Sequence, residues 1–423
     1  MRRVVITGMG ILSPIGNSVD AVAASLRDGR SGIRAMPEWA SVDGLQTRVA
    51  GAVDGFDAKQ IARPLRRTMG RMAIMASLAA RDAAADAGLS PEDLASARAG
   101  VSMGSTTGSP AALEQFFGSY VTTGSISGTE GTLFLKVMSH TVAANVAAVL
   151  GINGRLIAPG SACASSTQAI GSGFEAIRYG LQDIMVCGGA DDLHATTAGV
   201  FDVVGAASRG FNDSPSRTPR PFDRDRDGLV VSEGAAAVVL EEYEAARARG
   251  ATIHAELLGY GTCCNPNHMT QASADGMLQC MREAVESAGI SPRDLDYINA
   301  HATGTIRGDA VEAEAVRAFV GDTVPISGTK GYTGHTLAAC GAMEVIFCLI
   351  MMRRGFIPPT LNLEAIGPGC EGIAHVQKMI PRSPRLALTS NFAFGGVNAA
   401  LVLDGRGKTG EHKVRPCDGR DVT

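Results

Sequence analysis

Three residues of the chain have the side chains and the settings of a thiol-dependent active site. Cys163 follows a Gly-Ser pair in the segment GSACASS and stands at the start of an amphipathic helical pattern. His301 and His335 follow far downstream, in the Gly- and Thr-containing segments NAHATGT and KGYTGH. A cysteine at a helix N-terminus lies near partial positive charge, which predicts a thiol pKa below the ordinary value of about 8.5. Two imidazole donors beside it would stabilise an enolate or oxyanion, so the trio predicts acyl-transfer chemistry.

Further residues could support this trio. Lys330, five residues before His335, would influence imidazole protonation, and Glu344, nine residues after it, would orient the network. For each of these two residues a plain salt bridge is an equally good interpretation. The segment NFAFGGVN near the C-terminus has glycines that allow close backbone approach. The segment could be a simple connection between strands. Alternatively, the backbone N–H of its Phe394 could form an oxyanion hole together with the N–H of Cys163.

The composition excludes several classes of partner. A net charge of −4 over 423 residues gives no reason to expect nucleic-acid binding or attachment to an anionic membrane. The most apolar run, residues 345–352, is too short for a bilayer, which needs about 20 residues, so it predicts a buried helix. Nine cysteines without a CxxC pair predict reduced thiols and a cytoplasmic protein. The first residues enter a strand directly and show no signal-peptide core, so export is not expected.

Short β-branched runs alternate with Ala-rich helical patterns, which predicts α/β layers. Strands are expected at residues 4–6, 99–103, 184–187, 235–240, 255–260 and 297–300, and helices at 19–27, 68–87, 163–179, 242–249, 275–288 and 337–355. The helical segments that end at Gly180 and Gly355 are weakly alike. An internal duplication would place Cys163 and His335 at equivalent ends of paired central helices, but the sequence alone leaves this open.

Two segments look like ligand-binding motifs and fail on inspection. TGMGILS after the first strand has Ser13 where a dinucleotide fingerprint needs its third glycine, so we expect a tight turn. Residues 223–228, DRDRDG, begin like a calcium loop, but Gly234 stands where the twelfth-position glutamate belongs. There we expect salt bridges and a turn. The sequence has no Walker lysine, no HExxH and no paired Cys/His spacing, so no metal is expected.

Five motifs in order, VVITGMGILSPIG, SACASSTQAIG, NAHATGT, GTKGYTGH and NFAFGGVNAALV, resemble those of the β-ketoacyl-acyl-carrier-protein synthases I and II. The resemblance covers residues 1–404. It implies a thiolase-like, five-layered α/β/α/β/α fold with two pseudo-duplicated halves. We expect an N-terminal half at 1–250 with the cysteine, a C-terminal half at 251–404 with both histidines, and a flexible tail at 405–423. The family also implies a homodimer, and a heterodimer stays open.

The resemblance implies a role for each site residue. Cys163 would accept the acyl group, while His301 and His335 would support decarboxylation of malonyl-acyl carrier protein, with Lys330 and Glu344 as charged support. Phe394 matches a phenylalanine that gates the acyl pocket. The positions expected to contact substrate are Thr107, His268, Thr270, Thr303, Thr305, Phe392 and Ala393.

The implied reaction is a decarboxylative Claisen condensation that gives 3-oxoacyl-acyl carrier protein and CO2. It needs no metal or organic cofactor, because the phosphopantetheine arrives on the carrier protein. An acidic carrier requires a basic docking site, and a cluster of arginines could form it. The alternative interpretation of this cluster is the solvated face of a helix. The expected docking residues are Arg63, Arg66, Arg67, Arg71 and Arg209.

Departures from the family pattern leave the pathway open. The chain has HATGTI where HGTSTP is common, and AFGGVN, with Ala393, where GFGGTN is common. Thr107 takes a position associated with the depth of the acyl pocket across the dimer interface. Fatty-acid elongation and a specialised polyketide or polyene pathway, including a heterodimeric ketosynthase, therefore remain alternatives. A non-catalytic chain-length subunit would generally lack Cys163, and a thiolase would have a second catalytic cysteine near residues 391–398.

Overall fold

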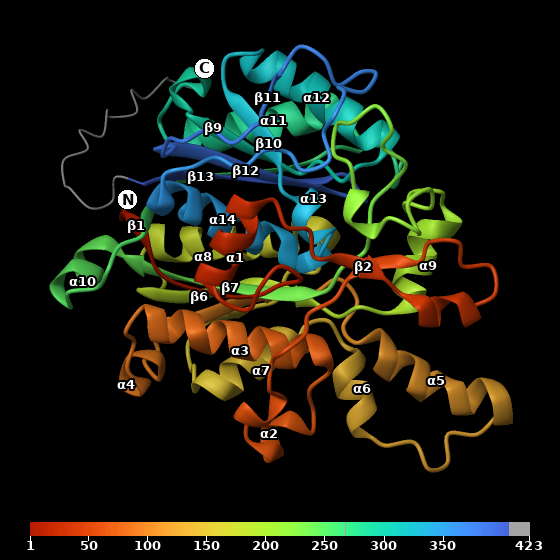
Figure 1. Cartoon of the computed structure of the whole chain (residues 1–423). Helices are drawn as coiled ribbons and strands as arrows, with labels where there is room; N and C mark the ends of the chain where they lie inside the picture. Colours follow the sequence, from red (N-terminus) through yellow and green to blue (C-terminus); the bar gives the residue numbers. More distant parts are fainter. Residues whose placement is uncertain (267, 406–423) are drawn as a thin grey trace.

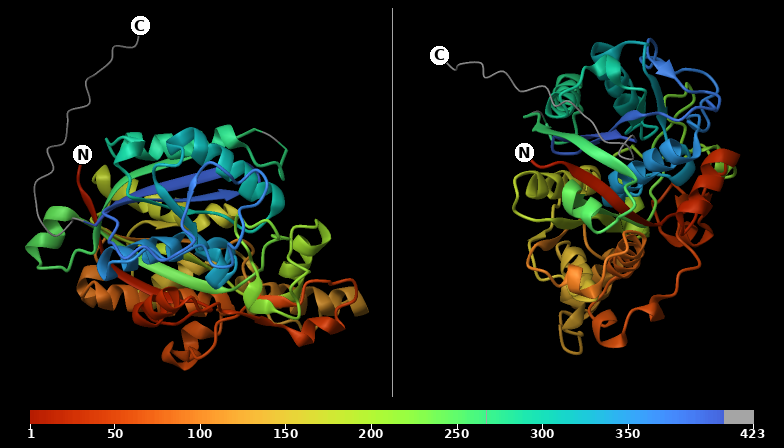
Figure 2. Two further views of the ribbon diagram at one scale, coloured as in Figure 1. Left: turned by 45° about the horizontal axis from the view of Figure 1, so that its top comes forward. Right: turned by 90° about the vertical axis from the view of Figure 1, so that its left-hand side faces the viewer.

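The computed structural model describes residues 1–266 and 268–405 and arranges them in five layers (Figure 1). Two central helices, α8 (Ser165–Arg178) and α14 (Cys340–Arg354), lie between two stacks of strands. The outer face of one stack is covered by α3 (Arg71–Asp86) and α7 (Thr141–Leu150). The other is covered by α11 (Ala274–Ser287) and α12 (Ile306–Val320), and Figure 2 shows the same layers from two further sides. The predicted α/β/α/β/α order is confirmed.

Each stack of strands comes from one half of the chain. The N-terminal stack has the order β5 (Leu156–Ile157), β4 (Ala99–Gly104), β6 (Ile184–Asp191), β7 (Gly234–Glu242) and β1 (Val4–Leu12). The C-terminal stack has the order β11 (Ala374–His375), β10 (Pro325–Gly328), β9 (Tyr297–Ala300), β12 (Leu386–Ala393), β13 (Val397–Asp404) and β8 (Ala255–Cys264). A short antiparallel contact of β1 with β8 joins the two stacks.

The two stacks repeat one topology. β1 pairs antiparallel with β7 and β7 with β6, and β8 pairs in the same way with β13 and β13 with β12. Parallel neighbours then follow on both sides, β6–β4–β5 in one half and β12–β9–β10 in the other. This confirms the internal duplication. The boundary at residue 250 stays a prediction, since the connection between β7 and β8 belongs to neither stack.

The remaining helices and strands lie around these layers. They are α1 (Val19–Asp28), β2 (Ile33–Ala35), β3 (Val49–Gly51), α2 (Arg63–Arg66), α4 (Pro91–Leu94), α5 (Pro110–Thr123), α6 (Thr132–Val137), α9 (Ala195–Val203), α10 (Tyr243–Ala248) and α13 (Lys330–Thr333). In Figure 1, α5 and α6 form an arm that projects from the body at the lower right.

The glycines of the first motif serve packing instead of a turn, so that prediction was wrong. Gly8 and Gly10 lie within β1, which runs on to Leu12. A Cβ at Gly8 would lie 2.1 Å from the carbonyl oxygen of Ala83, and one at Gly10 would lie 2.0 Å from that of Ala79. The absence of both side chains lets α3 lie directly on the strand.

The apolar run at residues 345–352 forms the middle of α14, and the predicted buried helix is confirmed. Its side chains from Val345 to Met351 are buried, because both stacks of strands pack against this helix, and Met352 is partly buried. No helix in the described ranges is long and apolar enough to cross a membrane. The expected tail lies outside the described residues, except for Gly405.

Candidate active site

Cys163 lies in a tight 3-10 turn, Ala162–Ala164, that leads directly into α8. The turn begins with Ala162 in a left-handed conformation, φ 46°. The second half repeats this arrangement, because Leu337, φ 51°, opens the turn Leu337–Ala339 before α14. The expected position of the cysteine at the start of a central helix is confirmed.

His301 follows the end of β9, in a loop held by two acidic residues of α12. Glu312 accepts hydrogen bonds from the N–H groups of His301 and Ala302, both at 2.7 Å. Asp309 accepts from the N–H of Gly304 at 3.1 Å. Both carboxyl groups are buried, and burial raises the pKa of Glu312 to about 8 and that of Asp309 to about 6. Neither residue was predicted from the sequence, although their i, i+3 spacing on the helix that follows HATGT would place both on the face toward this loop.

His335 is held through its backbone after a required glycine. Gly334 has φ 69°, and a Cβ there would lie 2.0 Å from the hydroxyl of Ser232. The His335 N–H donates to the carbonyl of Val230 at 2.7 Å, and its carbonyl accepts from Ser232 at 3.0 Å. The ring is therefore positioned by a short β-bridge.

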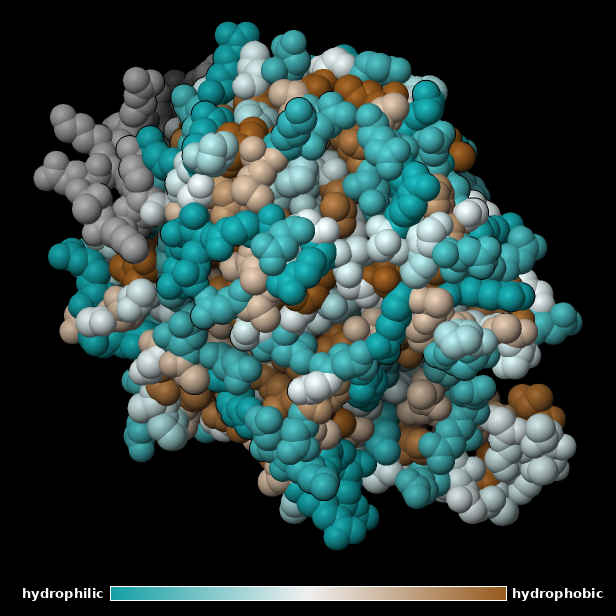
Figure 3. Space-filling model, in the orientation of Figure 1, coloured by the Kyte–Doolittle hydropathy of each residue, from teal (hydrophilic) through white to brown (hydrophobic). Residues whose placement is uncertain are grey.

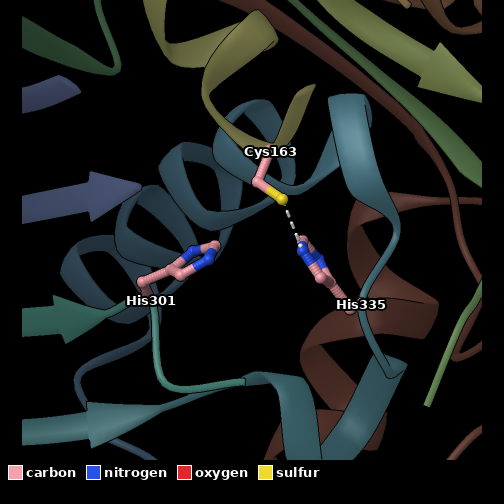
Figure 4. Close-up of side chains that lie close together, drawn as sticks. All are labelled: Cys163, His301 and His335. Atoms are coloured by element: carbon pink, nitrogen blue, oxygen red, sulfur yellow. Dashed lines mark hydrogen bonds between the residues drawn. The ribbon is translucent and has the colours of Figure 1, made fainter. Parts of the chain in front are cut away.

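The fold brings Cys163, His301 and His335 together (Figure 4). The Cys163 sulfur lies 2.9 Å from Nε2 of His335. The two imidazole rings meet edge to face, with centroids 5.3 Å apart at 85°. The sulfur and one nitrogen of each ring lie within 4.8 Å of one another, and all three residues are buried.

Lys330 and Glu344 form a buried pair behind His301, as expected for charged support. Nζ of Lys330 lies 2.5 Å from Oε1 of Glu344 and 3.3 Å from Nδ1 of His301. Asn391 of β12 completes the network, with Nδ2 at 2.7 Å from Oε2 of Glu344 and at 3.1 Å from Nδ1 of His301. Asn391 stood in a recognised motif, but its role was not predicted.

The electrostatics differ from the prediction for the thiol. Burial raises the pKa of Cys163 to about 12, while the positive charge of Lys330 acts in the opposite direction. Burial and the same charge hold the pKa of His301 and of His335 well below the ordinary value. At neutral pH the site therefore contains a thiol and two neutral imidazoles. The predicted lowering of the thiol pKa was wrong, because it rested on the helix N-terminus alone and burial of the thiol has the larger effect.

The trio opens into a cavity of about 510 Å³. Phe394 stands at this cavity, 46% exposed, with its ring stacked on Phe201 at 6.1 Å between centroids. Within the described residues, the N–H of Cys163 has no acceptor other than its own sulfur, and the N–H of Phe394 has none. The oxyanion hole stays a prediction. The other predicted substrate contacts at the cavity are Thr270, Thr303, Thr305, Phe392 and Ala393.

Two predicted substrate contacts do not line the cavity. Thr107 is exposed in the loop after β4, so any contact with acyl substrate would have to be in another protomer. His268 lies outside the lining and approaches it through Thr270, whose hydroxyl is 3.1 Å from Nδ1 of His268.

The predicted basic cluster is mostly engaged in internal contacts. Arg71 pairs with Glu233 at 2.7 Å, and Arg209 pairs with Asp202 at 2.6 Å. Arg66 donates to two backbone carbonyls in residues 58–61. Arg63 and Arg67 are exposed and form no ion pair with any residue that the structure describes. The docking role of the five arginines stays a prediction, and of the five only Arg63 and Arg67 are both exposed and without an ion pair to a described residue.

The DRDRDG segment is a turn with ion pairs, as predicted. Asp223 pairs with the buried Arg220 at 3.0 Å, and Arg224 lies 3.5 Å from Asp225 on the surface.

Comparison with known families matches both halves of the chain. Residues 1–246 match the family described as "Beta-ketoacyl synthase, N-terminal domain", and residues 254–364 match "Beta-ketoacyl synthase, C-terminal domain". The chain is 38% identical over 411 residues to 3-oxoacyl-[acyl-carrier-protein] synthase 1 of Haemophilus influenzae, covering 95% of this chain and 99% of the relative. It is 39% identical over 407 residues to the enzyme of the same name from Escherichia coli K12, with the same coverage.

Solved structures give the same result. A beta-ketoacyl synthase from Burkholderia phymatum superimposes with a TM-score of 0.92 and 41% identity, covering 96% of this chain and all of the other. The ishigamide ketosynthase/chain length factor has a TM-score of 0.89 and 33% identity, covering 95% and 99%. A type II polyketide ketosynthase solved with its acyl-carrier protein, AntDE:AntF, has a TM-score of 0.87 and 29% identity, covering 96% and 99%.

Proposed function

The chain belongs to the β-ketoacyl synthase family, and on this premise we propose that it elongates an acyl group on Cys163 with malonyl-acyl carrier protein. The protein is an acyltransferase of the ketosynthase type. The observation that carries the proposal is the convergence of Cys163, His301 and His335 on one cavity, which Phe394 also lines.

The first half-reaction transfers the acyl group to the cysteine. The Cys163 sulfur attacks the acyl-carrier thioester while its proton passes to Nε2 of His335, which lies 2.9 Å away. The N–H groups of Cys163 and Phe394 bind the oxygen of the tetrahedral adduct. The carrier thiol then leaves with the proton, and the acyl group stays on the sulfur.

The second half-reaction forms the carbon–carbon bond. Malonyl-carrier enters the same cavity and loses CO2, and the two imidazoles stabilise the negative charge on the enolate oxygen: His301 donates from Nε2–H, and His335 donates after its proton has moved from Nδ1 to Nε2. The carbanion attacks the acyl-Cys163 carbonyl, and the C–S bond breaks to release 3-oxoacyl-carrier. One proton is taken up, which restores the Cys163 thiol. No metal or organic cofactor is required by these steps.

The carrier is proposed to dock near Arg63 and Arg67, which are the two arginines of the predicted docking set that are exposed and have no ion pair with a described residue. Support comes from the similar ketosynthase solved with an acyl-carrier protein. A non-catalytic role for this chain is not favoured, because the cysteine is present and both histidines are assembled beside it.

We further propose a homodimer in the cytoplasm. Apolar side chains are exposed on the arm formed by α5 and α6, among them Phe117, Tyr120 and Phe134, and on the edge strand β5 at Leu156. Brown atoms on this arm are visible at the lower right of Figure 3. Such a surface is typical of a buried interface. The eight cysteines among the described residues are unbridged, which fits a reducing compartment.

Intact-mass analysis tests the proposed reaction. The purified protein is incubated with a panel of acyl-carriers, and malonyl-carrier is then added. We expect an acyl adduct that is absent in Cys163→Ala and present in Cys264→Ser, since Cys264 is exposed and outside the site. The Cys163→Ala variant should still release CO2 from malonyl-carrier. If no acyl donor modifies Cys163, the proposed function is refuted, and the preferred donor otherwise identifies the pathway.

A further inference from the structure

One nitrogen of His301 faces two hydrogen-bond donors. Nδ1 lies 3.3 Å from Nζ of Lys330 and 3.1 Å from Nδ2 of Asn391. An ammonium group has no acceptor, and an amide nitrogen only donates. Nδ1 must therefore accept, and the neutral ring carries its single proton on Nε2.

The orientation of the Asn391 amide is fixed by its other neighbours. Nδ2 lies 2.7 Å from the Glu344 carboxylate, which accepts, while Oδ1 is bonded to the hydroxyl of Thr167. A flipped amide would place its oxygen against the carboxylate and its nitrogen against the hydroxyl. Glu344, Thr167 and Asn391 are all buried, so water would not screen that repulsion.

The catalytic trio is otherwise a suitable set of metal ligands. A thiol and two imidazoles within 4.8 Å are the donor types that Zn²⁺ binds in proteins. A metal-binding imidazole offers an unprotonated nitrogen, and its opposite N–H donates to a carboxylate or carbonyl. His335 meets only the first of these conditions: its Nε2 faces the Cys163 sulfur at 2.9 Å, but its buried Nδ1 has no partner among the described residues. At His301 the second condition is opposed outright, because two donors stand where an acceptor is needed.

We propose that Asn391, together with Lys330, is a positioning residue that holds His301 as the Nε2–H tautomer and so prevents Cys163, His301 and His335 from binding a divalent metal together. Metal binding would require the His301 proton to move to Nδ1, against an ammonium group, and the thiol proton to leave for solvent. The use of the same Nε2–H as a donor to an enolate rests on the proposed function. The exclusion of metal rests only on the hydrogen bonds.

Nitrogen NMR of the wild-type protein tests the tautomer directly. With ¹⁵N-labelled histidine, and the His301 signals assigned by their loss in His301→Gln, we expect the shifts of a neutral ring protonated at Nε2. A neutral ring protonated at Nδ1 would overturn the proposal. This measurement needs no substituted active site, because the variant serves only for assignment.

A Co²⁺ titration tests the consequence for metals. Asn391→Asp places an acceptor beside Nδ1, whereas Asn391→Ala removes a donor and supplies no acceptor. We expect the Asp variant to bind Co²⁺ roughly 10- to 100-fold more tightly than wild type, with sulfur-to-cobalt charge-transfer absorption. This absorption should be lost when His301→Ala is added, and the Ala variant should stay near wild type.

Two outcomes of the titration would overturn the proposal: wild-type protein that binds Co²⁺ through the thiol as tightly as the Asp variant, or a folded Asp variant without increased affinity. If the Asp variant does not fold, the NMR result decides. The condensation assay is a separate readout, so a failure of the proposed function would leave both measurements interpretable.

Discussion

Lys330 and Glu344 form the most buried ion pair of the active site, with Nζ and Oε1 2.5 Å apart and side chains only 1% and 2% exposed. At an effective dielectric constant of about 20, this separation corresponds to a gross attraction of about 7 kcal/mol. Desolvation offsets much of it. Removal of one partner leaves a buried, unpaired charge, so Lys330→Met and Glu344→Leu should each lower the free energy of unfolding by about 3–5 kcal/mol.

The double variant removes both charges and should cost clearly less than the sum of the two single changes. We expect a coupling energy of about 3 kcal/mol or more from urea unfolding, followed by far-UV circular dichroism at one protein concentration. The matched control is the exposed pair Glu244–Arg247, 3.6 Å apart, for which less than about 1 kcal/mol is expected. Additive effects at Lys330 and Glu344, or single losses below about 1 kcal/mol, would refute this reasoning.

Three further predictions concern the reaction. Arg67→Glu should raise the KM for carrier substrates several-fold and leave the rate of iodoacetamide alkylation of Cys163 unchanged. An unchanged KM, or a change in the alkylation rate as large as the change in KM, would exclude docking at Arg67. Because burial holds the pKa of His301 and of His335 well below the ordinary value, both rings stay neutral, and the rate of CO2 release from malonyl-carrier should show no titration at the ordinary histidine pKa of about 6.5. A half-maximal rate near pH 6.5 would contradict this. Glu312→Ala should slow the release of CO2 at least tenfold, because Glu312 holds the loop that carries His301. Acylation of Cys163, measured by intact mass, should slow less, because no hydrogen bond in the part of the chain that the structure describes joins Glu312 to Cys163 or His335.

The sequence predicted those features that depend on short segments. The helix start at Cys163 and the glycine turn before His335 are local patterns, and both occur as expected. The period of the apolar residues likewise identified the buried α14. The layered order followed from the alternation of strands and helices together with the family resemblance, and the pairing of strands confirmed the duplication that the sequence left open.

The features that the sequence did not predict depend on partners distant in the chain. Glu233 and Asp202 pair with Arg71 and Arg209 in the fold, and neither pairing is visible in the sequence. Asn391 approaches His301 from a different strand, 90 residues away. The pKa of the Cys163 thiol was mispredicted for the same reason, since the sequence shows the helix that begins there and not the layers that enclose it.

The turns before α8 and α14 have the same backbone shape but differ in the hydrogen bonding of one backbone N–H group. By position, Cys163 corresponds to Ala338. The N–H of Ala338 donates to the carboxyl group of Asp191 at 2.8 Å, whereas the N–H of Cys163 has no acceptor among the described residues other than its own sulfur. A buried donor left unpaired costs about 1–3 kcal/mol. The second half thus satisfies this N–H within the fold, and in the first half the proposed oxyanion contact is what would satisfy it. On that proposal, acylation of Cys163 should raise the melting temperature of the protein.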